Sequence, residues 1–485
     1  MEDQQSGFRK EIRLLDGVML VAGTMIGSGI FIVSADIARN VGSSGYLLLV
    51  WALSGLLTII AALSYGELTS MMPKAGGQYI FLREAYNPLI AFLYGWTLFL
   101  VIQTGTIAAV GVAFAKFTGV FIPFFSPQNI VADLGILKIN TQELLAICII
   151  ILLSYINIRG VKNGKIIQTF FGSTKILALF ALIAIGIFIH DAAATSSNFG
   201  AQAWDAKRTI VDNGILMNRE ALSGWALIVA IGSAMVGSMF AMDAWNNITF
   251  AGEEVVNAKK TIPVSMAIGT MMVTLIYMLV NVVYLTNIPL EGKPDGLVDF
   301  ARGIQFATND RVGVVAADVM SGHTAVLIIA GLIMISTFSC LNGCILSGAR
   351  VYFKMADDKL FFKSMSRLNS KGVPAVALIF QAVWASLLCL SGTYNQLLDY
   401  VVFAVLLFYL LSIAGIFILR KKMPNAERPY KAFGFPVLPG IYLVLVTLIC
   451  SILLIYKTST AGWGLVIVLA GIPIYFILKS TRKQF

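Results

Sequence analysis

The sequence predicts an all-α membrane protein that crosses the bilayer many times, and three observations support this fold class. Of its 485 residues, 58% are hydrophobic and only 12% are charged, whereas a soluble chain carries about 25% charged residues. The mean hydropathy is +0.84. The apolar residues gather in runs of about 20 residues, which is the length that crosses a bilayer as a helix.

Twelve apolar segments are long enough to span a membrane. They lie at about 14–36, 45–71, 89–122, 142–158, 166–190, 223–252, 262–287, 312–350, 374–392, 395–419, 436–456 and 462–480. The third and eighth segments are longer than a bilayer requires, so we expect them to be tilted. The two long polar connections, 191–222 and 287–311, are expected to carry short helices of their own.

The basic residues predict the orientation of the chain. With twelve spans both termini lie on one side; that side holds 24 of the 35 lysines and arginines, the other side holds 10, and Lys175 lies within a span. This bias predicts cytoplasmic N- and C-termini in the cell membrane. It accounts for the net charge of +10 without a nucleic-acid partner. The polar N-terminus and the long first apolar run indicate no cleavable signal peptide.

The first segment contains the stretch GTMIGSGIF at 23–31, where glycines and hydroxyl residues replace bulky apolar ones. One interpretation is close helix packing through small residues, as in Gly23-xxx-Gly27. The other is a break in the helix, which is tolerated in a membrane only where the freed backbone faces protein or a cavity. Without GK[ST] after it, the glycine pattern is not a phosphate loop.

A break here would offer both halves of an amino-acid site. The N–H groups that open the second half-helix attract a carboxylate, and the Ser28 hydroxyl adds a donor. Carbonyls left unpaired before the break suit an ammonium group. The expected carboxylate site comprises Gly27, Ser28 and Gly29, and the expected carbonyls are those of Thr24 and Met25.

The sixth segment is also irregular, because Asp243, Trp245 and Asn246 follow an apolar start that includes Phe240. Two interrupted helices five spans apart indicate inverted repeats of five spans each. The predicted units are 1–190, 223–420 and two peripheral helices in 436–485. Asp243 is expected to line the substrate pocket, or alternatively to cap the broken helix. Phe240 and Trp245 are expected to form walls or a gate.

Lys175 lies about ten residues into the fifth segment, and an ionisable residue at membrane depth indicates function. Its ammonium is predicted to take the place of a bound sodium ion beside carbonyls of the first segment and a hydroxyl of the eighth. The alternative is an ammonium that reaches the cytoplasmic edge. The candidate hydroxyls are Ser336, Thr337 and Ser339.

The remaining polar residues indicate no metal, cofactor or covalent chemistry. The five cysteines lie in apolar runs without CxxC spacing and are expected to pack as small buried residues. His190 and His323 are isolated near span ends. Carboxylates at the cytoplasmic span ends are expected to form ion pairs with residues such as Arg350. These carboxylates are Glu67, Glu84, Glu253 and Glu254.

Several motifs together resemble the amino acid–polyamine–organocation superfamily, and within it the L-type amino acid transporter group. They are GTMIGSGIF, WALSGLLTIIAALSYGEL followed by PKAGGQY, STKILALFALI, FAMDAWNNITFAGEEVVNAKKTIP and STFSCLNGCILSGARVYFKMADD. The resemblance covers nearly the whole chain. It implies a 5+5 inverted-repeat fold and transport by alternating access.

The resemblance also assigns roles. It implies that Phe240 is an aromatic gate and that Lys175 stands in for sodium, and group members are often sodium-independent exchangers. The resemblance and the two irregular segments together predict the substrate-binding residues. These are Thr24, Met25, Gly27, Ser28, Gly29, Phe240, Ala241, Asp243, Trp245 and Asn246. Where relatives have a glycine, this chain has Ala244. Animal members pair with a heavy chain through a cysteine between spans 3 and 4; residues 118–141 contain none, so no disulfide-linked partner is expected.

The predicted function is sodium-independent exchange of neutral L-amino acids. The rivals are proton-coupled or cationic amino acid transport within the same superfamily, a polytopic membrane enzyme and a channel. The sequence leaves the substrates, the coupling and the oligomeric state open.

Overall fold

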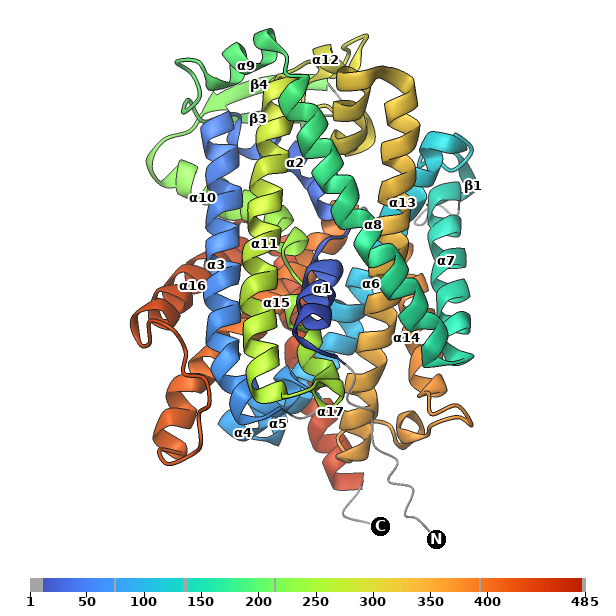
Figure 1. Cartoon of the computed structure of the whole chain (residues 1–485), viewed down its shortest axis with the longest axis vertical. Helices are drawn as coiled ribbons and strands as arrows, with labels where there is room; N and C mark the ends of the chain where they lie inside the picture. Colours follow the sequence, from blue (N-terminus) through green and yellow to red (C-terminus); the bar gives the residue numbers. More distant parts are fainter. Residues whose placement is uncertain (1–11, 74–75, 134–137, 213–214, 392–393, 482–485) are drawn as a thin grey trace.

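The computed structural model describes residues 12–73, 76–133, 138–212, 215–391 and 394–481, with the backbone alone for 161–173. Helices make up most of the chain and run roughly along one direction (Figure 1). Two short β-hairpins are the described departures from helix. The predicted all-α architecture is therefore confirmed in its main part.

The helices of the first half alternate between long apolar rods and short connecting helices. They are α1 (Leu14–Met25), α2 (Gly29–Val41), α3 (Ser44–Met71), α4 (Gln78–Ala85), α5 (Pro88–Thr97), the π-helical turn η1 (Leu98–Ile102), α6 (Gln103–Phe121), α7 (Thr141–Ile158), α8 (Val161–Phe188) and α9 (Ala192–Phe199).

Polar residues at the starts of these helices explain their bounds. The Asn87 side chain accepts a hydrogen bond from the Ile90 amide, and Pro88 occupies the first helical position of α5, where its missing N–H costs nothing. Asn140 and Glu143 form a reciprocal capping box at the start of α7, which satisfies two otherwise free amides.

The second half repeats the pattern of long apolar helices joined by short turns. Its helices are α10 (Gly224–Ala241), η2 (Trp245–Glu254, a 3₁₀ helix), α11 (Ala258–Asn287), α12 (Asp299–Arg302), η3 (Thr308–Asp310), α13 (Val312–Asp357), η4 (Lys363–Ser366), α14 (Ala375–Cys389), α15 (Tyr394–Lys422), α16 (Val437–Tyr456), η5 (Thr458–Gly462) and α17 (Trp463–Thr481).

Within the described residues, nine helices are long and apolar enough to cross a membrane, or up to eleven if each bent pair counts as one span. The helix α14, which corresponds to the predicted ninth segment at 374–392, is apolar but shorter than the spans counted above. The predicted third and eighth segments are indeed long, at 34 and 46 residues, and a kink at Gly322 (φ 70°, ψ −168°) interrupts the eighth. The eighth extends to Asp357 rather than ending near 350, because no glycine or proline interrupts 349–357.

Both predicted irregular segments are broken. The helices α1 and α2 meet at an angle of 45°, separated by Ile26, Gly27 and Ser28. In the sixth segment α10 ends at Ala241, and a 3₁₀ helix begins at Trp245.

The two long polar connections form a cap at the upper end of the molecule in Figure 1. The first contains the predicted short helix α9, but also an antiparallel hairpin of β3 (Lys207–Asp212) and β4 (Ile215–Ala221) that the sequence analysis missed. The second contains α12. A smaller hairpin, β1 (Ile130–Asp133) and β2 (Lys138–Asn140), joins α6 to α7.

The long helices pack around the two breaks. α3 lies along α11, as Figure 1 shows, and α13 packs against both α6 and α8. Buried polar pairs join neighbouring helices, as hydrogen bonds do inside membranes. They are Ser54 with Ser238 at 2.6 Å, Ser34 with Asn281 at 2.7 Å and Asn157 with Asn342 at 2.8 Å. The interior is therefore built around α1, α2, α10 and η2.

Candidate functional site

The break between α1 and α2 is formed by Ile26, Gly27 and Ser28. Ile26 leaves the helical conformation at ψ 94°, and α2 starts at Gly29. The first N–H groups of a helix have no intrahelical partner, so the start of α2 carries partial positive charge. Ser28 is fully buried, and its hydroxyl lies 3.0 Å from the Tyr394 hydroxyl. The start of α2 can therefore hold an anionic group.

Lys175 on α8 reaches this break from the side. Its ammonium donates hydrogen bonds to the carbonyls of Gly23 and Ile26, the latter at 2.9 Å, and its side chain is 1% exposed. The Ser336 hydroxyl on α13 donates to the same Ile26 carbonyl at 3.3 Å. The structure thus brings Lys175, a carbonyl of the first segment and a hydroxyl of the eighth together, and the ammonium does not reach the cytoplasmic edge.

The other two candidate hydroxyls have different surroundings. Thr337 donates to Ile333 in its own helix at 2.9 Å, and Ser339 is fully buried on α13. The hydrogen bonds of Thr337 thus stay within α13. Ser336 shares the Ile26 carbonyl as an acceptor with Lys175.

The carbonyls at Thr24 and Met25 were expected to be unpaired, and for Met25 this is wrong. The Tyr277 hydroxyl on α11 donates to the Met25 carbonyl at 3.1 Å. The Cys340 thiol lies 3.6 Å from the Thr24 carbonyl. A buried carbonyl without a partner is costly, so neighbouring helices supply donors in this conformation.

The second break lies beside the first. Met242, Asp243 and Ala244 separate α10 from η2, and Ala244 adopts a left-handed conformation with φ 66°. The Thr24 hydroxyl donates to the Ala244 carbonyl at 3.1 Å, which joins the two breaks directly. Left-handed backbone costs a residue with a Cβ about 1–2 kcal/mol, so the chain accepts strain at this turn.

Asp243 is held by a neighbour that the sequence analysis did not identify. The Tyr409 hydroxyl on α15 donates to Asp243 Oδ1 at 2.6 Å. A carboxylate inside a membrane protein needs such a partner or a water-filled cavity. Trp245, 1% exposed, packs against Tyr65 and Tyr409 with ring centroids 4.9 and 5.2 Å away. Trp245 is thus packed into an aromatic cluster beside the carboxylate.

Phe240 and Gly29 form contacts across the two breaks. The Phe240 ring meets the Tyr394 ring edge-on at 6.2 Å. A Cβ added at Gly29 would lie 2.5 Å from the Ala241 Cβ, far closer than the usual contact distance. Gly29 therefore allows α2 to approach the end of α10, and close packing accounts for this glycine in the present conformation.

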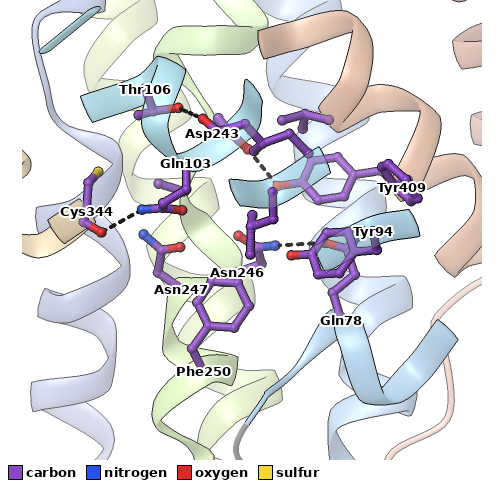
Figure 2. A pocket seen from close by; sticks show the side chains of 15 residues that line it. Gln78, Tyr94, Gln103, Thr106, Asp243, Asn246, Asn247, Phe250, Cys344 and Tyr409 are labelled. Atoms are coloured by element: carbon purple, nitrogen blue, oxygen red, sulfur yellow. Dashed lines mark hydrogen bonds between the residues drawn. The ribbon is translucent and has the colours of Figure 1, made fainter. Parts of the chain in front are cut away.

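Three small cavities meet at Asp243. The first, of about 20 Å³, is lined by Thr24, Met25, Gly27, Ser28 and Gly29 together with Phe240, Ala241 and Cys340. The second, of about 20 Å³, lies towards Trp245 and Tyr442. The third, of about 30 Å³, holds four amide side chains (Figure 2). Each holds about one water molecule, so the walls must separate before an amino acid can enter.

Figure 2 shows the third cavity, which we call the amide cavity and define by Gln78, Gln103, Asn246 and Asn247. Asn246 donates to Gln78 Oε1 at 3.3 Å, and Gln103 donates to the Cys344 carbonyl at 2.7 Å. Asp243 lies at its top and Phe250 at its bottom in this view. Of the predicted site residues, only Asp243 and Asn246 line this cavity.

Ion pairs close the ends of the helices opposite the cap, at span ends where such pairs were expected. Glu67, 1% exposed, accepts hydrogen bonds from Arg420 at 2.7 Å and from Arg428 at 3.2 Å. Arg350 pairs with Glu254 at 3.0 Å. Glu84 contacts Arg83, which also pairs with Asp358 at 2.6 Å. These pairs join α3, α4, η2, α13 and α15 below the site.

A second ionic cluster lies at the opposite end. Arg39, near the end of α2, donates to the Gln305 carbonyl at 2.7 Å and to Asp310 at 2.8 Å. Burial opposes ionisation of Asp310, but the positive charges of Arg39 and Lys116 outweigh it and lower the pKa of Asp310. The Lys116 ammonium also lies 5.7 Å above the Tyr394 ring. The upper end of α2 is therefore tied to the cap.

Sequence reasoning missed the tyrosines and amides that complete the site. Tyr277, Tyr394 and Tyr409 lie in apolar spans, where a tyrosine gives no sign of what its hydroxyl meets. Gln103 in the middle of the apolar segment 89–122 is a usable signal, because amides at membrane depth need partners. The whole set missed is Gln78, Gln103, Tyr277, Tyr394 and Tyr409.

The cysteines form no disulfide or metal site among the described residues. Four are buried, as expected, but Cys148 is exposed on α7. Helical apolar runs contain outward-facing positions as well as inward-facing ones, so a run alone does not decide burial.

Comparison with known proteins agrees with this geometry. Residues 12–478 match the family model described as amino acid permease. The chain belongs to the amino acid permease family. It is thus a member of the amino acid–polyamine–organocation superfamily and an amino acid transporter in a membrane, not an enzyme.

Several curated relatives align over nearly the whole chain. The serine/threonine exchanger SteT of Bacillus subtilis is 28% identical over 487 residues, covering 100% of both chains. The human b(0,+)-type amino acid transporter 1 is 29% identical over 98% of this chain and 89% of its own. The human cystine/glutamate transporter is 28% identical over 98% and 86%, respectively. Amino acid exchange thus occurs among the relatives.

Proposed function

We propose that this permease exchanges neutral L-amino acids across the cell membrane without sodium, by alternating access. The observation that carries the proposal is the position of Lys175, whose ammonium bonds the Gly23 and Ile26 carbonyls at the first break. In transporters with broken helices such carbonyls coordinate a coupling cation. A covalently attached ammonium supplies that charge without a bound ion, so a sodium ion has no role to fill.

The substrate head group is proposed to bind between the breaks. Its carboxylate takes the N–H groups that begin α2, at Gly27, Ser28 and Gly29, where the helix dipole favours an anion. Its ammonium takes carbonyls at Met25 and Ala241. The Tyr277 hydroxyl now lies 3.1 and 3.3 Å from these two oxygens, so it occupies the ammonium position until substrate displaces it.

The charges around the site favour a neutral amino acid. Asp243 is the only charged residue among those that the described chain contributes to the three cavities. Lys175 supplies one positive charge at the neighbouring first break. The opposite charges balance, and a zwitterion with an uncharged side chain preserves that balance. The named relative from Bacillus subtilis is an exchanger of serine and threonine, which are both neutral.

We further propose twelve spans arranged as two inverted repeats, 1–190 and 223–420, with accessory helices in 436–485. The corresponding breaks in the first and sixth segments support this arrangement. The lysine and arginine bias supports cytoplasmic termini. The absence of cysteine from 118–141 supports function without a disulfide-linked partner.

Alternating access requires the two ionic clusters to open in turn. Opening to the outside needs α2 to part from the cap at Arg39 and Asp310, and Phe240 to part from Tyr394. Opening to the cytoplasm needs separation at pairs such as Arg350 with Glu254. The proposed cycle breaks one cluster while the other stays intact.

Counterflow in proteoliposomes tests the proposal. Vesicles loaded with unlabelled alanine should take up labelled alanine equally in sodium and choline buffers, and empty vesicles should take up little. An absolute sodium requirement would remove Lys175 from its proposed role. Single-channel currents without trans-stimulation would point to a channel instead.

Asp243 favours a second candidate, which is proton-coupled or cationic amino acid transport. A carboxylate beside the substrate cavity can hold a proton or a basic side chain. The same vesicles separate the candidates: uptake of alanine that collapses with the proton gradient, or preference for arginine over alanine, would favour the second.

A further inference from the structure

The amide cavity is more polar than a head-group site alone requires. Gln78 on α4, Gln103 on α6, and Asn246 and Asn247 on η2 surround one small space, with Thr106 and Tyr409 beside them. All four amides are nine-tenths or more buried. Burying an amide away from water costs free energy unless it is hydrogen-bonded. Four buried amides around one cavity inside a membrane protein therefore indicate a functional role for that cavity.

One donor in this cavity is unsatisfied. Gln78 is 1% exposed, and its Nε2 has no hydrogen-bond partner among the described residues. Its Oε1 accepts a hydrogen bond from Asn246 at 3.3 Å, so the oxygen of the Gln78 amide, and not Nε2, faces Asn246. Native structures rarely leave buried donors unpaired, and such a group calls for an explanation. An acceptor brought by a ligand supplies one.

The amide cavity adjoins the proposed head-group site. Thr106, Asp243, Ala244 and Cys344 line both spaces. A substrate whose head group lies at the breaks can therefore extend its side chain past Asp243 towards the four amides. Because the walls must separate before entry, the chemistry of the lining carries more information than the size of the closed space.

We propose that the amide cavity is the side-chain subsite and that it selects carboxamide side chains, those of glutamine and asparagine. This inference rests on the proposed binding of the head group at the two breaks. The carboxamide oxygen accepts from Gln78 Nε2, and the carboxamide NH₂ donates to amide oxygens or to Asp243. Both halves of the side chain are thus satisfied.

Other side chains fit the lining less well. An apolar side chain leaves the Gln78 donor unpaired, and a site built for hydrogen bonds discriminates against such analogues. A carboxylate side chain is repelled by Asp243. An ammonium or guanidinium side chain offers no acceptor to Gln78. A short hydroxyl side chain remains near Thr106 and Asp243 and leaves the amides beyond unused.

Competition against labelled alanine in counterflow tests this selection. Glutamine and methionine are similar in length and differ mainly in the carboxamide. We expect glutamine to inhibit alanine exchange at roughly one-tenth the concentration of methionine, because one buried donor gains or lacks its partner. Glutamate and arginine should be weaker than glutamine. Ligand-induced thermal stabilisation of the purified protein should follow the same order.

Matched variants identify the residue responsible. Gln78→Met removes the donor at similar volume and should reduce the preference for glutamine over methionine, measured as the ratio of their inhibitory concentrations, to within about threefold. Gln381→Met is the control. It also removes a buried amide, one that donates to the Ile345 carbonyl on α13 and lines none of the three cavities. It should keep the preference.

The outcomes separate this inference from the function on which it rests. Equal inhibition by glutamine and methionine, with alanine exchange intact, overturns the carboxamide subsite and leaves neutral exchange standing. If the unmodified protein does not exchange alanine at all, the proposed exchange of neutral amino acids is itself overturned. If Gln381→Met loses the preference for glutamine over methionine as fully as Gln78→Met does, the selection cannot be assigned to Gln78. If Gln78→Met does not fold, the competition series on the unmodified protein still decides.

Discussion

The two helix breaks meet at one site but are built in different ways. The break between α1 and α2 uses small residues, and its carbonyls are contacted by side chains from α8, α11 and α13. The break between α10 and η2 contains Asp243, whose carboxylate faces Tyr409, and the strained Ala244. The first exposes backbone and the second presents side chains.

This difference suggests a division of labour. Every α-amino acid has the same head group, so backbone amides and carbonyls can recognise it without regard to the rest of the substrate. Discrimination among substrates then depends on side chains at the second break and in the amide cavity. The hydrogen bond from the Thr24 hydroxyl to the Ala244 carbonyl joins the two breaks.

The largest expected effect comes from Lys175→Ala, which removes the cation at the first break. It leaves the buried Gly23 and Ile26 carbonyls without this donor, and each unmade bond costs about 1–3 kcal/mol. We expect exchange in proteoliposomes to fall about 100-fold or more, while membrane insertion persists.

Lys371→Ala is the matched control for that variant. Its ammonium also donates to a backbone carbonyl, that of Arg159 at 2.8 Å, but the residue is exposed. Exchange should remain within about twofold, because exposed contacts contribute little. Unchanged exchange in Lys175→Ala would show that the first break does not depend on this cation.

The second prediction concerns the point where the breaks touch. Gly29→Ala places a Cβ against Ala241, and overpacking costs about 1–3 kcal/mol. We expect exchange to fall about tenfold. The double variant Gly29→Ala with Ala241→Gly removes the closest contact but leaves the new Cβ 2.8 Å from the Ala241 Cα. It should therefore restore part of the loss, measured by the same counterflow assay.

The double variant separates packing from ligand recognition at Gly29. If the single variant fails because its methyl blocks the carboxylate site, removing the Ala241 methyl will not help. No recovery at all, in a protein that remains folded and monodisperse, would therefore favour direct recognition at the start of α2.

The smallest expected effect is at the strained turn of the second break. Ala244→Gly removes the Cβ from a left-handed residue, which should raise stability by about 1 kcal/mol and the thermal melting temperature with it. Ala230→Gly, inside the regular helix α10, should lower stability by about the same amount. A lower melting temperature for Ala244→Gly would mean that packing of the methyl group outweighs the backbone strain.

Much of the fold was predictable because hydropathy and charge are local properties. Apolar runs located the long helices, and GTMIGSGIF together with Asp243 located both interruptions. The β3–β4 hairpin was missed because its polar strands lie in a loop without regular alternation. The length of α13 was underestimated because polar residues after 350 remain helical beyond the apolar run.

The sequence by itself determined that this chain is a membrane protein with one side more basic than the other, and it pointed to two broken helices and a buried lysine without deciding them. It could not determine which side chains meet at the breaks, because those contacts join residues far apart in the chain. Ser28 meets Tyr394 across 366 positions, and Asp243 meets Tyr409 across 166. Only the tertiary structure decided that Tyr277 covers the Met25 carbonyl and that four amides from three helices surround one cavity. Helix packing fixes these contacts, and no local pattern encodes them.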